Sequence, residues 1–373
     1  MKRTILILFL LFPLSLFSKN LVYNWFWGIE RIDHNDYFIL DLRPEFHYSL
    51  FHLKLDIPVE VNSNWTLYRE QWNDSKEDIV SKIEYFTVTN KNGFIRLSGL
   101  KNVSLGNKEL VWEYRNDLFE PFQKKRGLSS LFSFRSFNFQ FIMDDLVRYE
   151  RFFFQADYRT KRLETGMAYG LDRPASADKI DLFLNYHFFQ RGEWDFFWPG
   201  DYVQDLRQKA FFSSGLGMQY GPHIRFINKI KYFREHKSGA YYFGPFYVLS
   251  ERRSSTDKLG FSSELKFDFF RFFSFELQIQ KSGYHGWESL FLLRTGRRFP
   301  SRILCELEIV NRENTDWYDA FLETERNTIL SLRSGIPLSR NLWLKLDYLK
   351  NFSGSVRSLR GVHTLLFYSE FIF

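Results

Sequence analysis

The chain has 373 residues, of which 20% are aromatic and 25% charged, and its formal net charge is +7. After the N-terminal apolar run no second apolar run is long enough for a membrane-spanning helix, which excludes a helical membrane protein. The single cysteine, Cys305, excludes an internal disulfide. So much aromatic residue beside so much charge favours a sheet with one face in lipid and the other in water.

The first residues have the layout of a secretory signal peptide. Two basic residues precede an apolar run over Ile5–Phe17, and a polar segment begins at Ser18. The apolar run is shorter than the roughly 20 residues that a membrane-spanning helix needs. We therefore predict a signal peptide over residues 1–18 and a single transmembrane barrel domain over 19–373, with an uncleaved N-terminal anchor as the alternative.

The clearest strands form the first predicted hairpin. Apolar residues occupy alternate positions over 51–61, and the stretch 38–48 alternates in the same way, with only Ser49-Leu50 between them. Alternation over about eleven residues predicts tilted strands long enough to cross the hydrocarbon layer. Pro44 and Pro58 each lack a ladder donor, which predicts that they lie at a bulge or near a rim.

The same alternation recurs along the rest of the chain. It is clear over 151–159, 163–172, 259–269, 273–280 and 302–309, and weaker in many other segments. These segments predict an all-β fold, a transmembrane antiparallel β-barrel of about 16 strands, with 14 and 18 as the neighbouring even numbers. A barrel of this width can hold an aqueous lumen. The alternative is a secreted β-sandwich or jelly roll, whose strands are shorter.

Polar residues that alternate with the apolar ones are expected to face the lumen. Their charges are of both signs, so we expect ion pairs between neighbouring strands. The candidates are Asp41, Arg43, Glu45, His47, His52, Lys54, Asp56, Glu60, Arg151, Asp157, Arg159, Glu264, Lys266 and Asp268.

Small residues on the inward register of two strands predict space beside the wall. They are Gly166 and Gly170 on one strand and Gly215 and Gly217 on another. The segment 190–209 lies between these strands and is rich in large aromatic residues, so we expect it to fold into the lumen as a constriction loop. Glycines that relieve strain in a bent strand are the alternative.

No local motif for catalysis or for binding of phosphate, zinc or calcium is found, and we predict no catalytic residue, no metal site and no cofactor. His47 and His52 are expected to approach each other across the first hairpin. Because charged residues surround them on the same face, we interpret them as ordinary lumen residues.

The chain ends on alternating apolar residues, with Phe371 and Phe373 last. This segment resembles the C-terminal signature of bacterial outer-membrane β-barrel proteins. The resemblance implies that Phe371 and Phe373 form an assembly signal for the barrel-assembly machinery. It also implies the outer membrane of a Gram-negative-type bacterium as the location.

A second resemblance covers about 25 residues. The run from Phe94 to Gly106, followed by Tyr114-Arg115-Asn116, is similar to a stretch of porin-like barrels from spirochaetes and related Gram-negative bacteria. The sequence departs from the run shared by those barrels in that Ser98 falls between Arg96 and Gly99. The resemblance supports the location and implies no catalytic residue.

These features together predict a porin or solute channel for small hydrophilic molecules, and not an enzyme. The alternatives are a surface-exposed binding protein or adhesin on a plugged barrel, and an outer-membrane lipid-modifying enzyme. The expected partners are small hydrophilic solutes, the assembly machinery and outer-membrane lipid or lipopolysaccharide, with no nucleic acid. Basic clusters at 124–126, 252–253 and 297–298 are candidate contacts for lipid phosphates.

Overall fold

The computed structural model describes most of the chain between residues 21 and 372. The described ranges are 21–32, 35–62, 76–100, 103–107, 111–114, 126–173, 177–205, 210–233, 259–269, 272–281, 287–296, 303–314, 328–339, 342–352 and 361–372. The predicted signal peptide and Phe373 lie outside these ranges, as do residues 124–125, 252–253 and 297–298.

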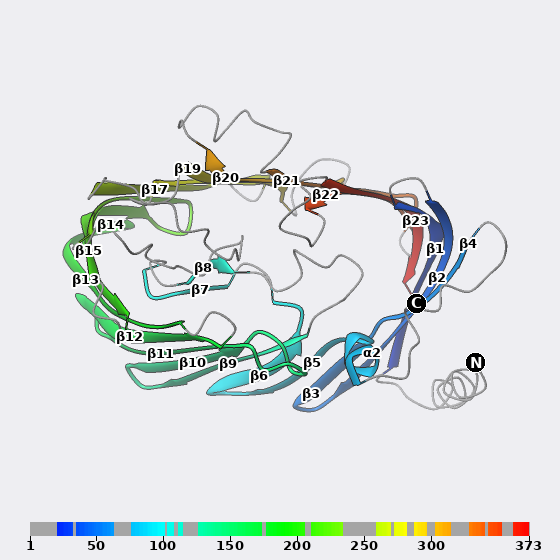
Figure 1. The fold of residues 1–373 in the computed structure, drawn as a ribbon, viewed down its shortest axis with the longest axis horizontal. Helices are drawn as coiled ribbons and strands as arrows, with labels where there is room; N and C mark the ends of the chain where they lie inside the picture. The colour runs from blue at the N-terminus through cyan, green and yellow to red at the C-terminus, as the bar shows by residue number, and fades with distance from the viewer. Residues whose placement is uncertain are drawn as a thin grey trace.

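One antiparallel sheet of 21 strands closes on itself, because the first strand, β1, pairs with both β2 and the last strand, β23 (Figure 1). The strands β3 and β4 pair with successive parts of β2 and share one position in the ring, so the described strands fill 20 positions. The predicted antiparallel β-barrel is confirmed. The strand number is larger than the predicted 16, although it is even.

The strands of the ring are between 5 and 15 residues long. The strands of the first part of the chain are β1 (Leu21–Ile32), β2 (Asn35–Tyr48), β3 (Phe51–Leu55), β4 (Ile57–Asn62), β5 (Ile83–Asn90), β6 (Gly93–Ser98), β9 (Gly127–Phe134), β10 (Phe137–Met143), β11 (Arg151–Arg159) and β12 (Leu163–Asp172). The later strands are β13 (Ala177–Arg191), β14 (Trp194–Asp205), β15 (Ala210–Tyr220), β16 (Ile224–Phe233), β17 (Leu259–Phe269), β18 (Phe273–Lys281), β19 (Trp287–Thr295), β20 (Leu304–Asn314), β21 (Thr328–Pro337), β22 (Leu342–Phe352) and β23 (Gly361–Ile372).

Three further elements lie outside the ring order. The helix α2 (Lys76–Ser81) precedes β5, and β7 (Val103–Leu105) and β8 (Val111–Tyr114) pair only with each other. Within the described residues, no helix has the length and the apolar character needed to cross a membrane.

A series of short turns lies at one rim of the ring. At each of these turns a main-chain oxygen accepts a hydrogen bond from an N–H group of the next hairpin along the rim. The pairs, with the N–H donor first, are Thr89–Leu50, Ser133–Asn92, Arg159–Ser136, His187–Arg162, Gly221–Glu193, Asp268–His223 and Gly296–Phe272. β23 ends opposite the first residue of β22, so its end lies at the same rim. We refer to this edge as the short-turn rim.

The first hairpin is interrupted on one strand. Asp56 separates β3 from β4, and its N–H donates to the main-chain oxygen of Lys82 at 2.7 Å. Pro58 follows the register shift at Lys54/Leu55, in agreement with the prediction of a bulge. Pro44 pairs with Tyr23 of β1, and on its other side the ladder of β2 is interrupted, because pairing with β3 ends at Glu45 and pairing with β4 begins at Leu42.

The outer face of the ring is apolar, and the inner face carries charge. On β16, Ile230 and Tyr232 are 63% and 48% exposed, whereas the alternating Lys229 and Lys231 are each 5% exposed. A water-soluble protein has the opposite polarity, so this wall is suited to a lipid surround.

Ion pairs between neighbouring strands confirm the prediction of a salt-bridged wall. They connect Arg159 with Glu164, Arg225 with Glu264 at 3.8 Å, Lys266 with Glu276 at 3.4 Å, and Arg294 with Glu306 at 2.6 Å.

The segment 190–209 is not an inserted loop, and that prediction is wrong. Its residues Trp194–Asp205 form β14, which pairs with β13 and β15 in the wall. The buried ring of Phe197 lies over Gly217 of the next strand, where a Cβ atom would be 2.3 Å from the ring. Phe183 covers Gly166 in the same way, at 2.7 Å. A ring from the neighbouring strand thus occupies the space above each of these glycines.

We expect Gly217→Ala to destabilise the barrel. The added methyl group would overlap the Phe197 ring, and overpacking of this kind costs about 1–3 kcal/mol. The matched control is Gly335→Ala, because a Cβ atom there would be 3.4 Å from the nearest side-chain atom, Lys345 Cγ. Thermal unfolding in detergent micelles measures both, and equal stability of the two variants would contradict the packing described.

Candidate functional site: an inner hairpin and the pocket beside it

The connection between β6 and β9 enters the interior of the ring. Its strands β7 and β8 form a small hairpin that Figure 1 shows inside the oval of wall strands. Leu105, at the end of β7, is only 1% exposed. The wall and this inner hairpin therefore pack against each other, and the hairpin occupies part of the barrel cross-section.

Two residues at the end of β7 attach the inner hairpin to the wall. The N–H of Gly106 donates to Gln155 Oε1 of β11 at 2.6 Å. The side-chain oxygen of Asn107 accepts from Asn185 Nδ2 of β13 at 2.7 Å, and its main-chain oxygen accepts from Lys229 Nζ of β16 at 2.7 Å. Three wall strands therefore hold one end of the hairpin.

Gly106 is the residue that permits this close approach. Its φ is +58°, a left-handed conformation that L side chains rarely adopt. A Cβ atom there would lie 2.6 Å from Asp181 Oδ2 and 3.3 Å from Phe183 Cδ1. Both the backbone angle and the contact with the wall therefore require glycine.

Lys229 links the inner hairpin to a buried ion pair. Besides Asn107, its ammonium group contacts Asp201 Oδ2 at 3.2 Å, and Ser213 Oγ donates to the same oxygen at 2.7 Å. The side chains of Lys229 and Asp201 are 5% and 0% exposed. In such a site the charges interact more strongly than at a water-exposed surface.

A cavity of about 140 Å³ lies between the inner hairpin and strands β14, β16, β17 and β18. Arg225, Lys229 and Lys231 line it from β16, and Glu264 lines it from β17, where it pairs with Arg225. Ser104, Ser262, Ser263 and Gln278 add hydroxyl and amide groups. This lining can hydrogen-bond a small hydrophilic solute and can hold charges of both signs.

Most of the predicted lumen residues make polar contacts in the wall. The carboxylate of Asp157 accepts from Asn138 and from Gln155, which also holds the inner hairpin. Ion pairs join Arg43 to Asp41 and Asp56, Lys54 to Glu84, Arg151 to Asp144 and Asp172, Arg159 to Glu164, Glu264 to Arg225, and Lys266 to Glu276. Asp268 donates its N–H to His223 at the short-turn rim, and the side chain of Glu60 lies outside the described residues.

The four glycines predicted to leave space beside the wall all lie in wall strands, next to the aromatic rings or the backbone of neighbouring strands. Gly166 and Gly217 lie under Phe183 and Phe197, as described above, and Gly170 pairs with Phe153. A Cβ atom at Gly215 would meet the main-chain oxygen of Asn228 at 1.8 Å. Phe183 is the only one of these rings that also lies near Gly106 in the described contacts.

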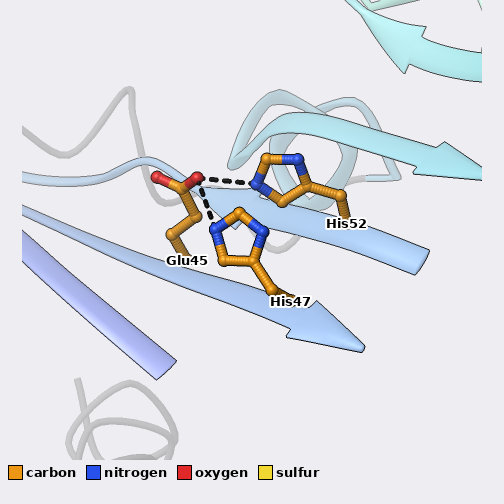
Figure 2. A group of neighbouring side chains, drawn as sticks. All are labelled: Glu45, His47 and His52. Atoms are coloured by element: carbon orange, nitrogen blue, oxygen red, sulfur yellow. Dashed lines mark hydrogen bonds and ion pairs between the residues drawn. The ribbon is translucent and has the colours of Figure 1, made fainter. Parts of the chain in front are cut away.

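The structure brings Glu45, His47 and His52 together at the first hairpin. One ligand atom from each lies within 4.8 Å of the other two, so among the residues that the structure describes this group could hold a metal ion (Figure 2). The expected approach of the two histidines is confirmed, with ring centroids 3.9 Å apart. The sequence contains no recognised metal-binding motif at this position, because the three residues come from two strands that are separated by a turn.

Sequence reasoning missed the inner hairpin. The run from Phe94 to Gly106 and the residues up to Tyr114 contain most of β6 and all of β7 and β8, but their sequence shows no alternation long enough to predict a hairpin. Arg126, in a basic cluster proposed for lipid contact, is 8% exposed and donates to the main-chain oxygens of Ser81 and Ile83. Because this guanidinium group is buried and bound to the backbone, the hypothesis that Arg126 contacts lipid phosphates is wrong.

No protein-family model matches this chain, and no curated protein matches its sequence. Among solved structures, OccAB2 of Acinetobacter baumannii has 9% identity and a TM-score of 0.40, over 95% of this chain and 97% of that one. OccK5 (OpdH) of Pseudomonas aeruginosa has 9% identity and a TM-score of 0.38, with 95% and 97% covered. The outer membrane protein opdK of the same organism has 10% identity and a TM-score of 0.36, with 95% and 98% covered.

Proposed function

We propose that this protein is an outer-membrane solute channel whose interior is narrowed by the inner hairpin. The observation that supports it most directly is the reversed polarity of the wall, with Ile230 and Tyr232 exposed outside and Lys229 and Lys231 buried inside. A closed ring leaves no unpaired sheet edge, which is what a strand protein needs in a lipid bilayer.

The size of the ring supports a channel. Barrels of 16–18 strands leave an aqueous interior, and this ring has 20 described positions. The inner hairpin fills part of that interior, and the hydrophilic cavity beside it lies where a passing solute would meet Arg225, Lys229 and Glu264. Mixed charges there suit small hydrophilic solutes rather than one strongly preferred ion sign.

Single-channel recording in planar bilayers tests the proposal. The refolded protein is expected to give stable conductance steps, and small sugars that enter the cavity are expected to reduce the current during their passage. A barrel that is folded, as shown by its heat-dependent mobility in gels, but gives no steps would contradict the channel.

We further propose that β23 carries the signal for assembly, with Phe371 and Phe373 as its recognised residues. The backbone of Phe371 pairs with Trp25 of β1 and Leu342 of β22, so the strand also completes the ring. We also propose contact with lipopolysaccharide and a relation to the spirochaete barrels, and both proposals rest on the sequence alone. Phe371→Ala is expected to lower the amount of protein in the outer membrane while refolding in detergent is retained, and equal losses in both assays would count against recognition.

A further inference from the structure

We infer that Glu45, His47 and His52 form a binding site for a divalent transition-metal ion such as Zn²⁺ at the short-turn rim. Glu45 and His47 are two positions apart on β2, so their side chains lie on one face of the strand. His52 is the direct cross-strand partner of His47 on β3. The fold of the hairpin alone therefore presents three metal-binding side chains side by side.

The donor atoms converge on a single point. His47 Nε2 and His52 Nε2 lie 2.9 Å and 2.6 Å from the same oxygen, Glu45 Oε1 (Figure 2). Bond lengths of 2.0–2.2 Å in a tetrahedral zinc site place neighbouring ligand atoms about 3.3 Å apart. Each imidazole nitrogen would need to move away from Glu45 Oε1 by less than about 1 Å to reach this spacing.

The set of ligands is one that zinc uses. Two imidazole nitrogens and one carboxylate oxygen make a three-ligand site that leaves one position for water. Imidazole also suits copper and nickel, whereas Mg²⁺ and Ca²⁺ prefer sites made of oxygen alone. The chemical class expected is therefore a borderline transition-metal ion and not a hard cation.

Tyr85 of β5 supports the arrangement from outside the ligand set. Its hydroxyl lies 3.0 Å from Glu45 Oε1 and 2.8 Å from His52 Nε2. The hydroxyl donates to Glu45, and the tautomer of His52 decides whether its Nε2 donates to or accepts from Tyr85. A metal ion would bind both imidazoles and the carboxylate and leave Tyr85 free to orient Glu45.

Access and neighbouring charge favour an ion from solution. The side chains of His47 and His52 are 49% and 32% exposed, so an ion can reach them. Lys54 is the cross-strand partner of Glu45, but its ammonium group pairs with Glu84 at 3.0 Å. The lysine opposite Glu45 is therefore paired with the carboxylate of Glu84.

Isothermal titration of the refolded, untagged protein with ZnCl₂ tests the inference. We expect one Zn²⁺ bound per chain, no heat of binding with MgCl₂, and loss of the zinc signal in both His47→Ala and His52→Ala. Tyr85→Phe is expected to retain one site with affinity weakened about 10-fold or more, as for other residues that orient a ligand. His187→Ala is the matched control, because His187 contacts Asp195 on another hairpin and should leave zinc binding unchanged.

A second variant and a second measurement keep the test decisive if an alanine variant fails to fold. His52→Gln retains a polar side chain at the strand position, and Co²⁺ added to the folded proteins reports nitrogen ligands through its visible absorption. Absence of zinc binding in the unmodified protein overturns the inference, and so does binding that persists in His47→Ala or His52→Gln. None of these readouts depends on channel activity, so they stand apart from the proposed function.

Discussion

Replacing the inner hairpin, residues 103–114, by a short glycine-serine linker is expected to raise the single-channel conductance several-fold. The hairpin lies within the ring of wall strands, and its removal widens the path for ions (Figure 1). Solute block is expected to weaken as well, because Ser104, Gly106 and Asn107 form one side of the cavity.

A milder change should give a graded result. Asn185→Ala removes the bond to Asn107 and is expected to increase current fluctuations without a large change in the mean. Asn138→Ala is the matched control, since Asn138 donates to Asp157 within the wall and contacts no described hairpin residue.

Unchanged conductance after removal of the whole inner hairpin would show that the narrowest point of the channel lies elsewhere.

Lys229→Met is expected to lower the free energy of unfolding by about 3 kcal/mol, because loss of one partner of a buried ion pair leaves the other charge in a poorly hydrated site. The carboxylate of Asp201, 3.2 Å away, is the charge affected. The same substitution also removes the bond to the Asn107 oxygen, so the inner hairpin should become less firmly held.

Lys266→Met provides the comparison for this effect. Its ion pair with Glu276 is longer, at 3.4 Å, and the Lys266 side chain is 53% exposed, so the expected loss is about 1 kcal/mol or less. Denaturant unfolding followed by tryptophan fluorescence measures both variants. In Lys229→Met combined with Asp201→Leu, most of the stability should return, and additive losses would contradict coupling between the two charges.

The wall could be predicted wherever one face is apolar and the other polar. The predicted segments 163–172 and 259–269 coincide with β12 and β17 because strict alternation leaves no other register. Prediction failed at β14, where consecutive aromatic residues conceal the alternation. There the ring of Phe197 lies over Gly217 on the inner side, while Trp198 is exposed outside, so both faces carry large apolar residues.

The inner hairpin could not be predicted because distant residues hold it. Gly106 is bound by a residue 49 positions away, and Asn107 by residues 78 and 122 positions away. No local pattern encodes such contacts. The histidine pair, in contrast, depends on a local contact, because a two-residue turn brings His47 and His52 into register. Tyr85, which contacts His52, is 33 residues away in the sequence and could not be predicted.

The pairing of β1 with β23 has a consequence for how the barrel forms. Asn24 is the partner of Ile372, so the final ladder joins the two most distant described parts of the chain. Pairing over such a long separation forms slowly, because the entropy of closing the loop is lost before any ladder hydrogen bond is gained. We therefore expect closure of this seam to be the last and slowest event of folding. Until it occurs, two unsatisfied strand edges remain open to pairing with another chain.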